Sequence, residues 1–341
     1  MLLHNKYKGY KLIRRLTFIL TLITVMSGKI IFSSEVNYVV PSNEEVGYRE
    51  DGSGAFRTHC LESHITNDDP LMFPNIAGGA HLHVFFGNPT IDSFTTVEDL
   101  KNTNHTKCDG GILNKSAYWV PALIGSNGER LKYVDPLFYY KTGYHVPSHL
   151  ISAPPDGLVM IAGDAKSDRL QSTEVIKIRC ASWQSNREWF DPGDPLDHVS
   201  FIPSCPLNDL VEVRIVFPQC WNGTDTIAGD YKSHMAYPIK AVPPITGTGY
   251  CPQSHPVAIP EISFNFAIYV TNDSGPSQNW RFSSDDKNST VGGKTLHADW
   301  INGWEKDIMA TIVRNCLNPG KECLVGLLGN GKKLRPIILE N

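Results

Sequence analysis

Two histidines one residue apart, His81 and His83, stand in the largely apolar segment Gly78–Asn88. In an extended chain, alternate side chains share a face, so both imidazoles point the same way. Buried imidazoles need hydrogen-bond partners and are costly as plain core residues. The spacing therefore indicates a functional site, and the alternative is a pair of structural histidines held by the backbone and water.

Two further segments combine histidine with a carboxylate. Asp230, Lys232 and His234 place a carboxylate, an ammonium and an imidazole within five residues, which is the mixture that acid–base catalysis uses. His297 and Asp299 flank the start of a predicted helix, where Asp299 is also suited to be the N-cap. The alternative for the Asp230 segment is a hydrogen-bonded loop. We predict one cleft whose catalytic residues are His81, His83, Asp230, Lys232, His234, His297 and Asp299.

The same residues allow a metal site. His81 and His83 on one strand are a reasonable start for a zinc or copper site, which one or both of His234 and His297 would complete. A divalent metal is the cofactor that this pattern allows, and its identity is left open. The aromatic residues Trp119, Tyr140 and Trp300 are expected to bind a sugar substrate, although such residues more often belong to a core.

The N-terminus has the pattern of a signal peptide. Basic residues up to Arg15 precede the apolar run Leu16–Met26, which is short for a membrane span. We predict a signal peptide over residues 1–27 and a secreted, extracellular protein without a membrane span after cleavage; the alternative is an uncleaved anchor. The net charge of −4 lacks a basic stripe, so we expect no nucleic-acid partner. We expect a monomer.

Eight cysteines behind a signal peptide favour disulfide bonds. The sequence does not fix their connectivity, and the simplest guess is that neighbours pair, as Cys60–Cys108, Cys180–Cys205, Cys220–Cys251 and Cys316–Cys323. Glycosylation sequons begin at Asn104, Asn114, Asn222, Asn272 and Asn288. In a eukaryotic host these would carry glycans, and they would then mark exposed loops.

Period-two hydrophobic patterns dominate the chain and predict strands. The clearest are Leu210–Phe217 and Ile262–Val270, and others are Tyr118–Ile124, Val134–Tyr140, Leu158–Ala162 and Glu174–Cys180. We predict a mainly β fold, an antiparallel β-sandwich-like core with long disulfide-bonded loops and a C-terminal helix near residues 300–314. Residues 28–55 should form a loosely ordered lead-in and residues 56–330 a single globular domain.

A series of segments in one order, over roughly residues 56–317, resembles a secreted domain family of fungi and actinobacteria, domain of unknown function nineteen-ninety-six. They are Phe56–Cys60, Asp68–Pro70, Ala80–Asn88, Tyr118–Leu123, Tyr139–Lys141, Met160–Ala165, Phe217–Gly223, Lys232–Pro238, Cys251–Val257 and His297–Trp300. The resemblance implies a secreted protein whose relatives often stand beside cell-wall or carbohydrate-binding modules. It implies no established activity.

Three functions fit these observations. The first is an extracellular enzyme acting on polysaccharide, either a hydrolase that uses paired carboxylates or a lyase that abstracts a proton beside a uronate. The second is a non-catalytic module that binds cell-wall glycan. The third is a histidine-ligated metal-binding protein, and this function is compatible with catalysis. We expect the polysaccharide-acting enzyme, with a glycan as its partner.

Overall fold

A computed structural model describes residues 37–181, 198–242 and 245–337. The predicted signal peptide, residues 1–27, lies outside the described residues. Residues 37–341 form one compact unit. The chain is mainly β, as predicted, and within the described residues no helix has both the length and the apolar character needed to cross a membrane.

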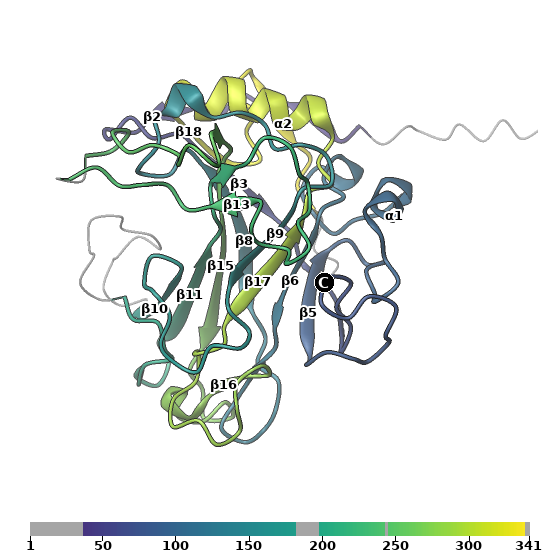
Figure 1. Cartoon of the computed structure of the whole chain (residues 1–341), viewed down its shortest axis with the longest axis vertical. Helices are drawn as coiled ribbons and strands as arrows, with labels where there is room; N and C mark the ends of the chain where they lie inside the picture. Colours follow the sequence, from purple (N-terminus) through teal and green to yellow (C-terminus); the bar gives the residue numbers. More distant parts are fainter. Residues whose placement is uncertain (1–36, 182–197, 243–244, 338–341) are drawn as a thin grey trace, which may run out of the picture. The chain divides into compact units, whose positions relative to one another are not determined.

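The two large sheets of the fold contain most of the longer strands (Figure 1). The strands are β1 (Val39–Pro41), β2 (Gly47–Tyr48), β3 (Ala55–His59), β4 (Glu62–Thr66), β5 (His83–Gly87), β6 (Ala117–Pro121), β7 (Leu123–Ile124), β8 (Val134–Lys141), β9 (Val159–Gly163), β10 (Ile176–Ala181), β11 (Leu210–Val216), β12 (Cys220–Trp221), β13 (Met235–Ala236), β14 (Val257–Ala258), β15 (Glu261–Tyr269), β16 (Arg281–Phe282), β17 (His297–Ile301), β18 (Lys321–Val325) and β19 (Lys332–Leu334). The helices are α1 (Val97–Asn102) and α2 (Lys306–Ile312), and a π-helical turn, Val313–Leu317, continues α2.

A seven-stranded sheet has the order β10-β11-β15-β8-β3-β18-β2, and a five-stranded sheet has the order β4-β5-β6-β17-β9. All neighbours in these two sheets are antiparallel except β18 and β3. The main core lies between the two sheets. Tyr118 of the five-stranded sheet packs on Phe138 and Phe264 of the other, with ring centroids 4.3 and 5.5 Å apart. The fold is therefore the sandwich that the sequence predicts.

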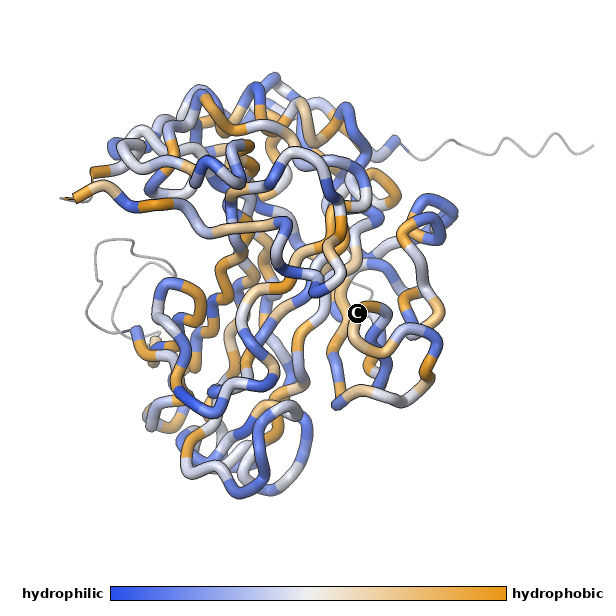
Figure 2. Tube along the Cα trace, in the orientation of Figure 1, coloured by the Kyte–Doolittle hydropathy of each residue, from blue (hydrophilic) through white to orange (hydrophobic). Residues whose placement is uncertain are grey.

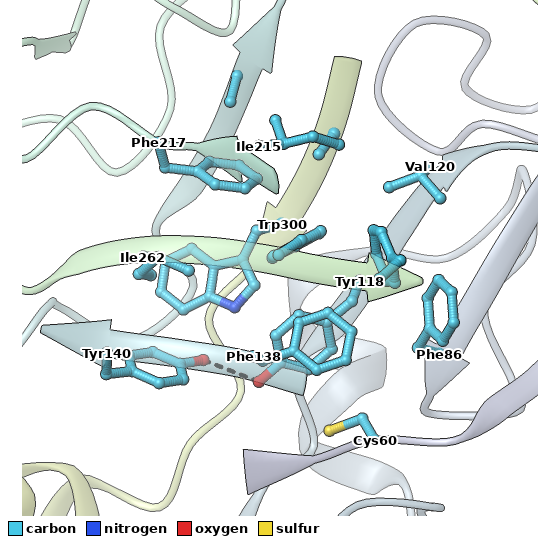
Figure 3. Packing of buried hydrophobic residues seen from close by; sticks show 14 of the residues in the cluster. Cys60, Phe86, Tyr118, Val120, Phe138, Tyr140, Ile215, Phe217, Ile262 and Trp300 are labelled. Atoms are coloured by element: carbon cyan, nitrogen blue, oxygen red, sulfur yellow. Dashed lines mark hydrogen bonds between the residues drawn. The ribbon is translucent and has the colours of Figure 1, made fainter. Parts of the chain in front are cut away.

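The core between the sheets contains a small hydrogen-bonded network as well as apolar side chains (Figure 3). The hydroxyl groups of Tyr118 and Tyr140 lie 2.8 Å apart, and the indole N–H of Trp304 donates to Tyr140 over 2.8 Å. A buried polar group without a partner is costly, so each of these groups satisfies another. The network fixes the two sheets and the segment before α2 against one another.

The strands predicted from period-two patterns are present in the structure. In β11 and β15 the hydrophobic members face the core, as Val213 and Phe264 do, while alternate residues such as Arg214 lie on the other face. This alternation of hydrophobic and hydrophilic residues runs along the strands in Figure 2. Packing against the opposite sheet is the reason for the pattern, because only one face of each strand contacts the core.

The C-terminal helix is present, but the prediction that Asp299 caps it is wrong. Asp299 lies within β17, opposite Trp119 of β6 and Ile161 of β9. The helix α2 begins at Lys306, after Glu305. Trp300 and Ile301 are apolar because β17 is buried on both faces. In the sequence, Ile301 fits the helical spacing of the later apolar residues Ile308 and Ile312, which is why the helix was expected to begin earlier.

The four disulfides join neighbouring cysteines, which confirms the simplest pairing: Cys60–Cys108, Cys180–Cys205, Cys220–Cys251 and Cys316–Cys323. The expectation that sequons mark exposed loops is wrong at one position. Asn114 is completely buried, and its side-chain amide donates to Tyr118 over 2.9 Å. Asn104, Asn272 and Asn288 are exposed.

The described part of the expected lead-in, residues 37–55, carries regular structure. Here β1 pairs with β19, and β2 pairs with β18. Both partners belong to the C-terminal part of the chain, so the two ends of the described region lie together.

Candidate metal centre

The outer face of the five-stranded sheet, away from the main core, carries three of the predicted site residues, which are His83, His297 and Asp299. His83 is the first residue of β5 and His297 the first of β17, with β6 between the two strands. Phe85 and Asp299 lie opposite the same residue of β6, Trp119, from its two sides. Because side chains two residues apart in a strand share a face, the imidazoles of His83 and His297 project from that same face.

A second, smaller apolar cluster covers the rest of this face. It joins residues of the sheet to residues of the segments that follow β4 and β5. Its members are Leu71, Phe85, Ile91, Leu100, Ala117, Trp119, Val159 and Ile301.

Three imidazoles converge at the end of this face. The ring centroids of His81 and His83 are 4.2 Å apart, and His297 lies 5.0 Å from His81 and 5.8 Å from His83. One nitrogen from each ring lies within 4.8 Å of the other two. His83 and His297 are buried, and His81 is half-buried. Among the described residues, this is the one group of three possible metal ligands so arranged.

Backbone carbonyl groups fix which ring nitrogen carries the proton in two of the histidines. His83 Nδ1 lies 2.9 Å from the carbonyl oxygen of Asp68, and His297 Nδ1 lies 2.8 Å from that of Thr295. A carbonyl oxygen only accepts, so each Nδ1 donates its N–H and each Nε2 keeps a free lone pair. Metal-bound histidines are held in this way, by a second hydrogen bond from the other ring nitrogen.

Two ring nitrogens of the cluster have no protein partner within the described structure. The Nε2 atoms of His81 and His83 are buried and have no hydrogen-bond partner among the residues described. Burial lowers the pKa of His81 to about 4 and that of His297 to about 3. Burial, together with the charges that His81 and His297 would carry, also lowers the pKa of His83. The three imidazoles are therefore neutral at physiological pH, which is the form that binds metals.

Two buried carboxyl groups border the histidines. Asp299 Oδ2 lies 3.8 Å from His297 Nε2, and within the described part of the chain neither oxygen of Asp299 has a hydrogen-bond partner. The carboxyl of Asp69 accepts the backbone N–H groups of Leu71 and Met72. Burial first, and then the charge of Asp69, raise the pKa of Asp299 well above its usual range.

The structure places the Asp230–His234 segment beside this cluster but gives its members separate partners. Asp230 is exposed, and it accepts the backbone N–H groups of Ser233 and Lys232, which lower its pKa to about 2. Lys232 donates to the carbonyl oxygen of Gly163, the residue of β9 opposite His297. His234 is buried, and its Nε2 lies 2.6 Å from the carbonyl oxygen of Val159.

The three aromatic residues expected to bind sugar are all in the interior. Trp119 and Trp300 are completely buried and so is Tyr140, in which the hydroxyl belongs to the core network. Figure 3 shows Tyr140 and Trp300 packed among the side chains of the main core. A ring stacks on a sugar only through an exposed face, so these three residues have the positions of structural core residues.

A surface cavity of about 270 Å³ lies beside β9, the strand that pairs with β17. Its lining includes Ile161 and Gly163 of β9, which pair with Asp299 and His297 of β17, respectively. The polar side chains of its lining include Asp164, Ser172, Lys232 and Tyr237. The cavity therefore offers one ammonium and several oxygen groups beside β9.

Sequence reasoning identified all three clustered histidines but missed the groups that orient them. Asp68 and Thr295 act through backbone carbonyls, for which residue type carries no signal. Asp69 was assigned no role at the site, although the two adjacent acidic residues Asp68 and Asp69 are visible in the sequence.

A two-sheet β-sandwich with a buried histidine cluster on the outer face of one sheet defines the structural class. The chain belongs to the family described as "Domain of unknown function (DUF1996)", which matches residues 69–304 and confirms the resemblance noted in the sequence. The match includes all three histidines and Asp299. Comparison with curated proteins and with solved structures gave no match.

Proposed function

We propose that this protein binds one divalent transition-metal ion through the imidazoles of His81, His83 and His297. The observation that carries the proposal is the orientation of the rings. His83 and His297 each donate Nδ1–H to a backbone carbonyl, which leaves the Nε2 lone pair of each ring free, and one nitrogen from each of the three rings lies within 4.8 Å of the other two. Neutral, unpartnered imidazoles in a dry interior are costly unless something accepts their lone pairs. A metal ion does so.

The charges around the histidines also favour a cation. Asp299 and Asp69 are both buried, and two nearby carboxylates repel one another in a low-dielectric interior. The nearby ammonium group of Lys232 is exposed and engaged with Gly163. A divalent ion between the histidines would stabilise the ionised form of Asp299, which burial and the charge of Asp69 otherwise disfavour.

Imidazole ligands suit zinc and copper best among the common metals. Three histidines with a further position open to water or substrate are typical of catalytic zinc sites, whereas structural zinc sites are closed by four protein ligands. His81 is half-buried, so the cluster has one side close to solvent. We therefore infer a Zn²⁺- or Cu²⁺-binding centre that is accessible from the side of His81.

The test is metal stoichiometry. The disulfide-intact protein is stripped with a chelator, incubated with Zn²⁺ or Cu²⁺ and desalted, and its metal content is measured by plasma mass spectrometry. We expect about one equivalent for the wild type and almost none for the double variant His83→Ala/His297→Ala. The control is His64→Gln, because His64 is on the neighbouring strand β4 and stacks on Phe85 without belonging to the cluster. Equal metal content in all three proteins, or none in the wild type, would overturn the proposal.

A second candidate, an enzyme acting on polysaccharide, is supported by the cavity beside β9. Lys232 is in its lining and is also close enough to His297 to affect the pKa of that imidazole. An ammonium group there suits the carboxylate of a uronate residue, and a metal ion beside it would polarise the bond to be cleaved. This candidate is a hydrolase or lyase of uronate-containing glycan.

Product analysis tests this second candidate. Uronate-containing and neutral polysaccharides are incubated with the metal-loaded protein, and the released oligosaccharides are read by mass spectrometry. We expect release from the uronate-containing glycans alone, and loss of release after chelation or in Lys232→Met. The matched control is Lys166→Met, an exposed lysine close to the same strand. No products from any glycan would remove the enzyme and leave the metal-binding protein.

A further inference from the structure

Asp299 is the buried group near the histidines that the three-histidine centre leaves without a role. It is 1% exposed, and neither carboxyl oxygen has a hydrogen-bond partner in the described residues. A carboxyl group buried in this way costs stability unless it is hydrogen-bonded or coordinates a metal. Its position in the middle of β17 is fixed by pairing on both sides, with Trp119 and Ile161.

We propose that Asp299 is a fourth protein ligand, so that the ion is held by three imidazole nitrogens and one carboxylate oxygen. The inference rests on the proposed three-histidine centre and deepens it by naming a fourth protein donor, so that water or substrate would reach the ion from the side of His81 as a fifth ligand. The carboxylate oxygen of Asp299 is a harder ligand than an imidazole nitrogen, and it adds a negative charge to the site.

The geometry suits this role. Two ligand atoms that each lie about 2.0 Å from a tetrahedral ion are separated by about 3.3 Å. Asp299 Oδ2 lies 3.8 Å from His297 Nε2, the atom whose lone pair is left free by the hydrogen bond to Thr295. A small rotation of the carboxyl group closes the difference, and His297 and Asp299 project side by side from one strand.

Asp69 is the alternative carboxylate, and its contacts argue against it. One oxygen of Asp69 already accepts two backbone N–H groups, from Leu71 and Met72, and thereby holds the turn that precedes the histidines. Asp299 has no such engagement. Asp69 therefore shapes the loop, and Asp299 is the group with both oxygens available.

A donor set of three imidazoles and one carboxylate has a chemical consequence. Carboxylate oxygen favours divalent ions over the soft Cu⁺ ion, which selects thiolate and thioether ligands. We expect the site to hold Zn²⁺ and Co²⁺ and to bind Cu⁺ poorly.

The experiment compares Co²⁺ and Zn²⁺ binding by wild type, Asp299→Asn and the control Asp69→Asn. Co²⁺ reports ligands through its visible absorption, and Zn²⁺ affinity is measured by competition with a chelator. If Asp299 is a ligand, Asp299→Asn shifts the Co²⁺ spectrum and weakens Zn²⁺ binding by about 100-fold or more, a loss at the upper end of outer-shell effects. Asp69→Asn removes a nearby charge and leaves the Co²⁺ spectrum unchanged.

The outcomes separate the two proposals. Wild type that binds no metal removes the three-histidine centre itself. Wild type that binds metal, with an unchanged spectrum and affinity in Asp299→Asn, overturns only the fourth ligand. If Asp299→Asn fails to fold, infrared difference spectra of the wild type decide: Zn²⁺ binding must convert a carboxyl band into that of a metal-bound carboxylate, and an unchanged carboxyl region contradicts the inference.

Discussion

His83 donates its Nδ1–H to the backbone carbonyl of Asp68 over 2.9 Å. This single hydrogen bond determines what the ring can do, because it leaves Nε2 as a lone pair in the interior. His297 has the same relationship to Thr295. The two strands, which are separated by β6, bring these rings together, and one nitrogen from each lies within 4.8 Å of one from the half-buried His81.

Metal binding should stabilise the fold. The ligands come from β17, from β5 and from the segment just before β5, which meet only in the folded chain. Zn²⁺ at about 100 times its dissociation constant should therefore add about 2.7 kcal/mol to the free energy of unfolding. Thermal unfolding with and without chelator measures this change. His64→Gln should keep the shift and His83→Ala/His297→Ala should lose it; a shift of equal size in both would place the ion elsewhere.

The hydrogen bonds of His59 predict a pH-dependent stability unrelated to the metal. Bonds first to Asp109 and then to Asp135 raise the pKa of His59 to about 9. Since the folded pKa lies above the unfolded value of 6.5, the stabilisation is complete below about pH 6.5 and is lost as the pH rises through about 9.

His59→Gln is the variant that tests this pH dependence. It should be less stable than wild type by roughly 1 kcal/mol near pH 6, after allowance for solvent screening. The difference should disappear near pH 10. Urea unfolding at the two pH values measures it, and a difference that stays constant would show that protonation of His59 plays no part.

The core network should depend on the hydroxyl of Tyr140. Tyr140→Phe leaves the buried N–H of Trp304 without its acceptor and breaks the contact with Tyr118. A cost of about 1–3 kcal/mol in unfolding free energy follows from the lost partner of a buried donor. Chemical denaturation measures the free energy of unfolding. Tyr269→Phe is the control, because Tyr269 is 42% exposed and removal of its hydroxyl should change the stability less. Equal stability of the two variants would mean that the network contributes nothing.

Burial should decide which sequons are modified. When the protein is secreted from a eukaryotic host, we expect glycans at the exposed Asn104, Asn272 and Asn288. Asn114 should be unmodified, because its side chain is buried against Tyr118 and Cys60. Glycopeptide mass spectrometry distinguishes these sites. A fully occupied Asn114 in stable, folded protein would contradict the structure around the first disulfide.

Much of the fold could be predicted from local patterns. Alternation along residues 210–217 and 262–270 predicts strands because one face of each strand must be buried. His81 and His83 were predicted to share a face because alternate side chains of an extended chain point the same way; His81 lies just before β5, and the two rings are 4.2 Å apart. The disulfide pairing was only a guess, and the structure confirms it.

Long-range packing explains what the sequence could not predict. Asp299 was expected at a helix start because the apolar residues after it fit a helical period, but pairing with β6 and β9 makes the segment a strand. Trp119, Tyr140 and Trp300 have the composition of a sugar platform, and only the tertiary structure reveals that Tyr140 and Trp300 are buried between the sheets and Trp119 in the second apolar cluster. Likewise, no local pattern indicates that Thr295 and Asp68 orient two histidines through their carbonyl groups.

X-ray absorption of the Zn²⁺-loaded wild type shows whether three imidazoles bind one ion. We expect a first shell at about 2.0–2.1 Å with the outer scattering of three imidazole rings. The same measurement on His83→Ala/His297→Ala should show no such shell. Zinc surrounded by oxygen ligands without imidazole scattering in the wild type would rule out the three-histidine centre.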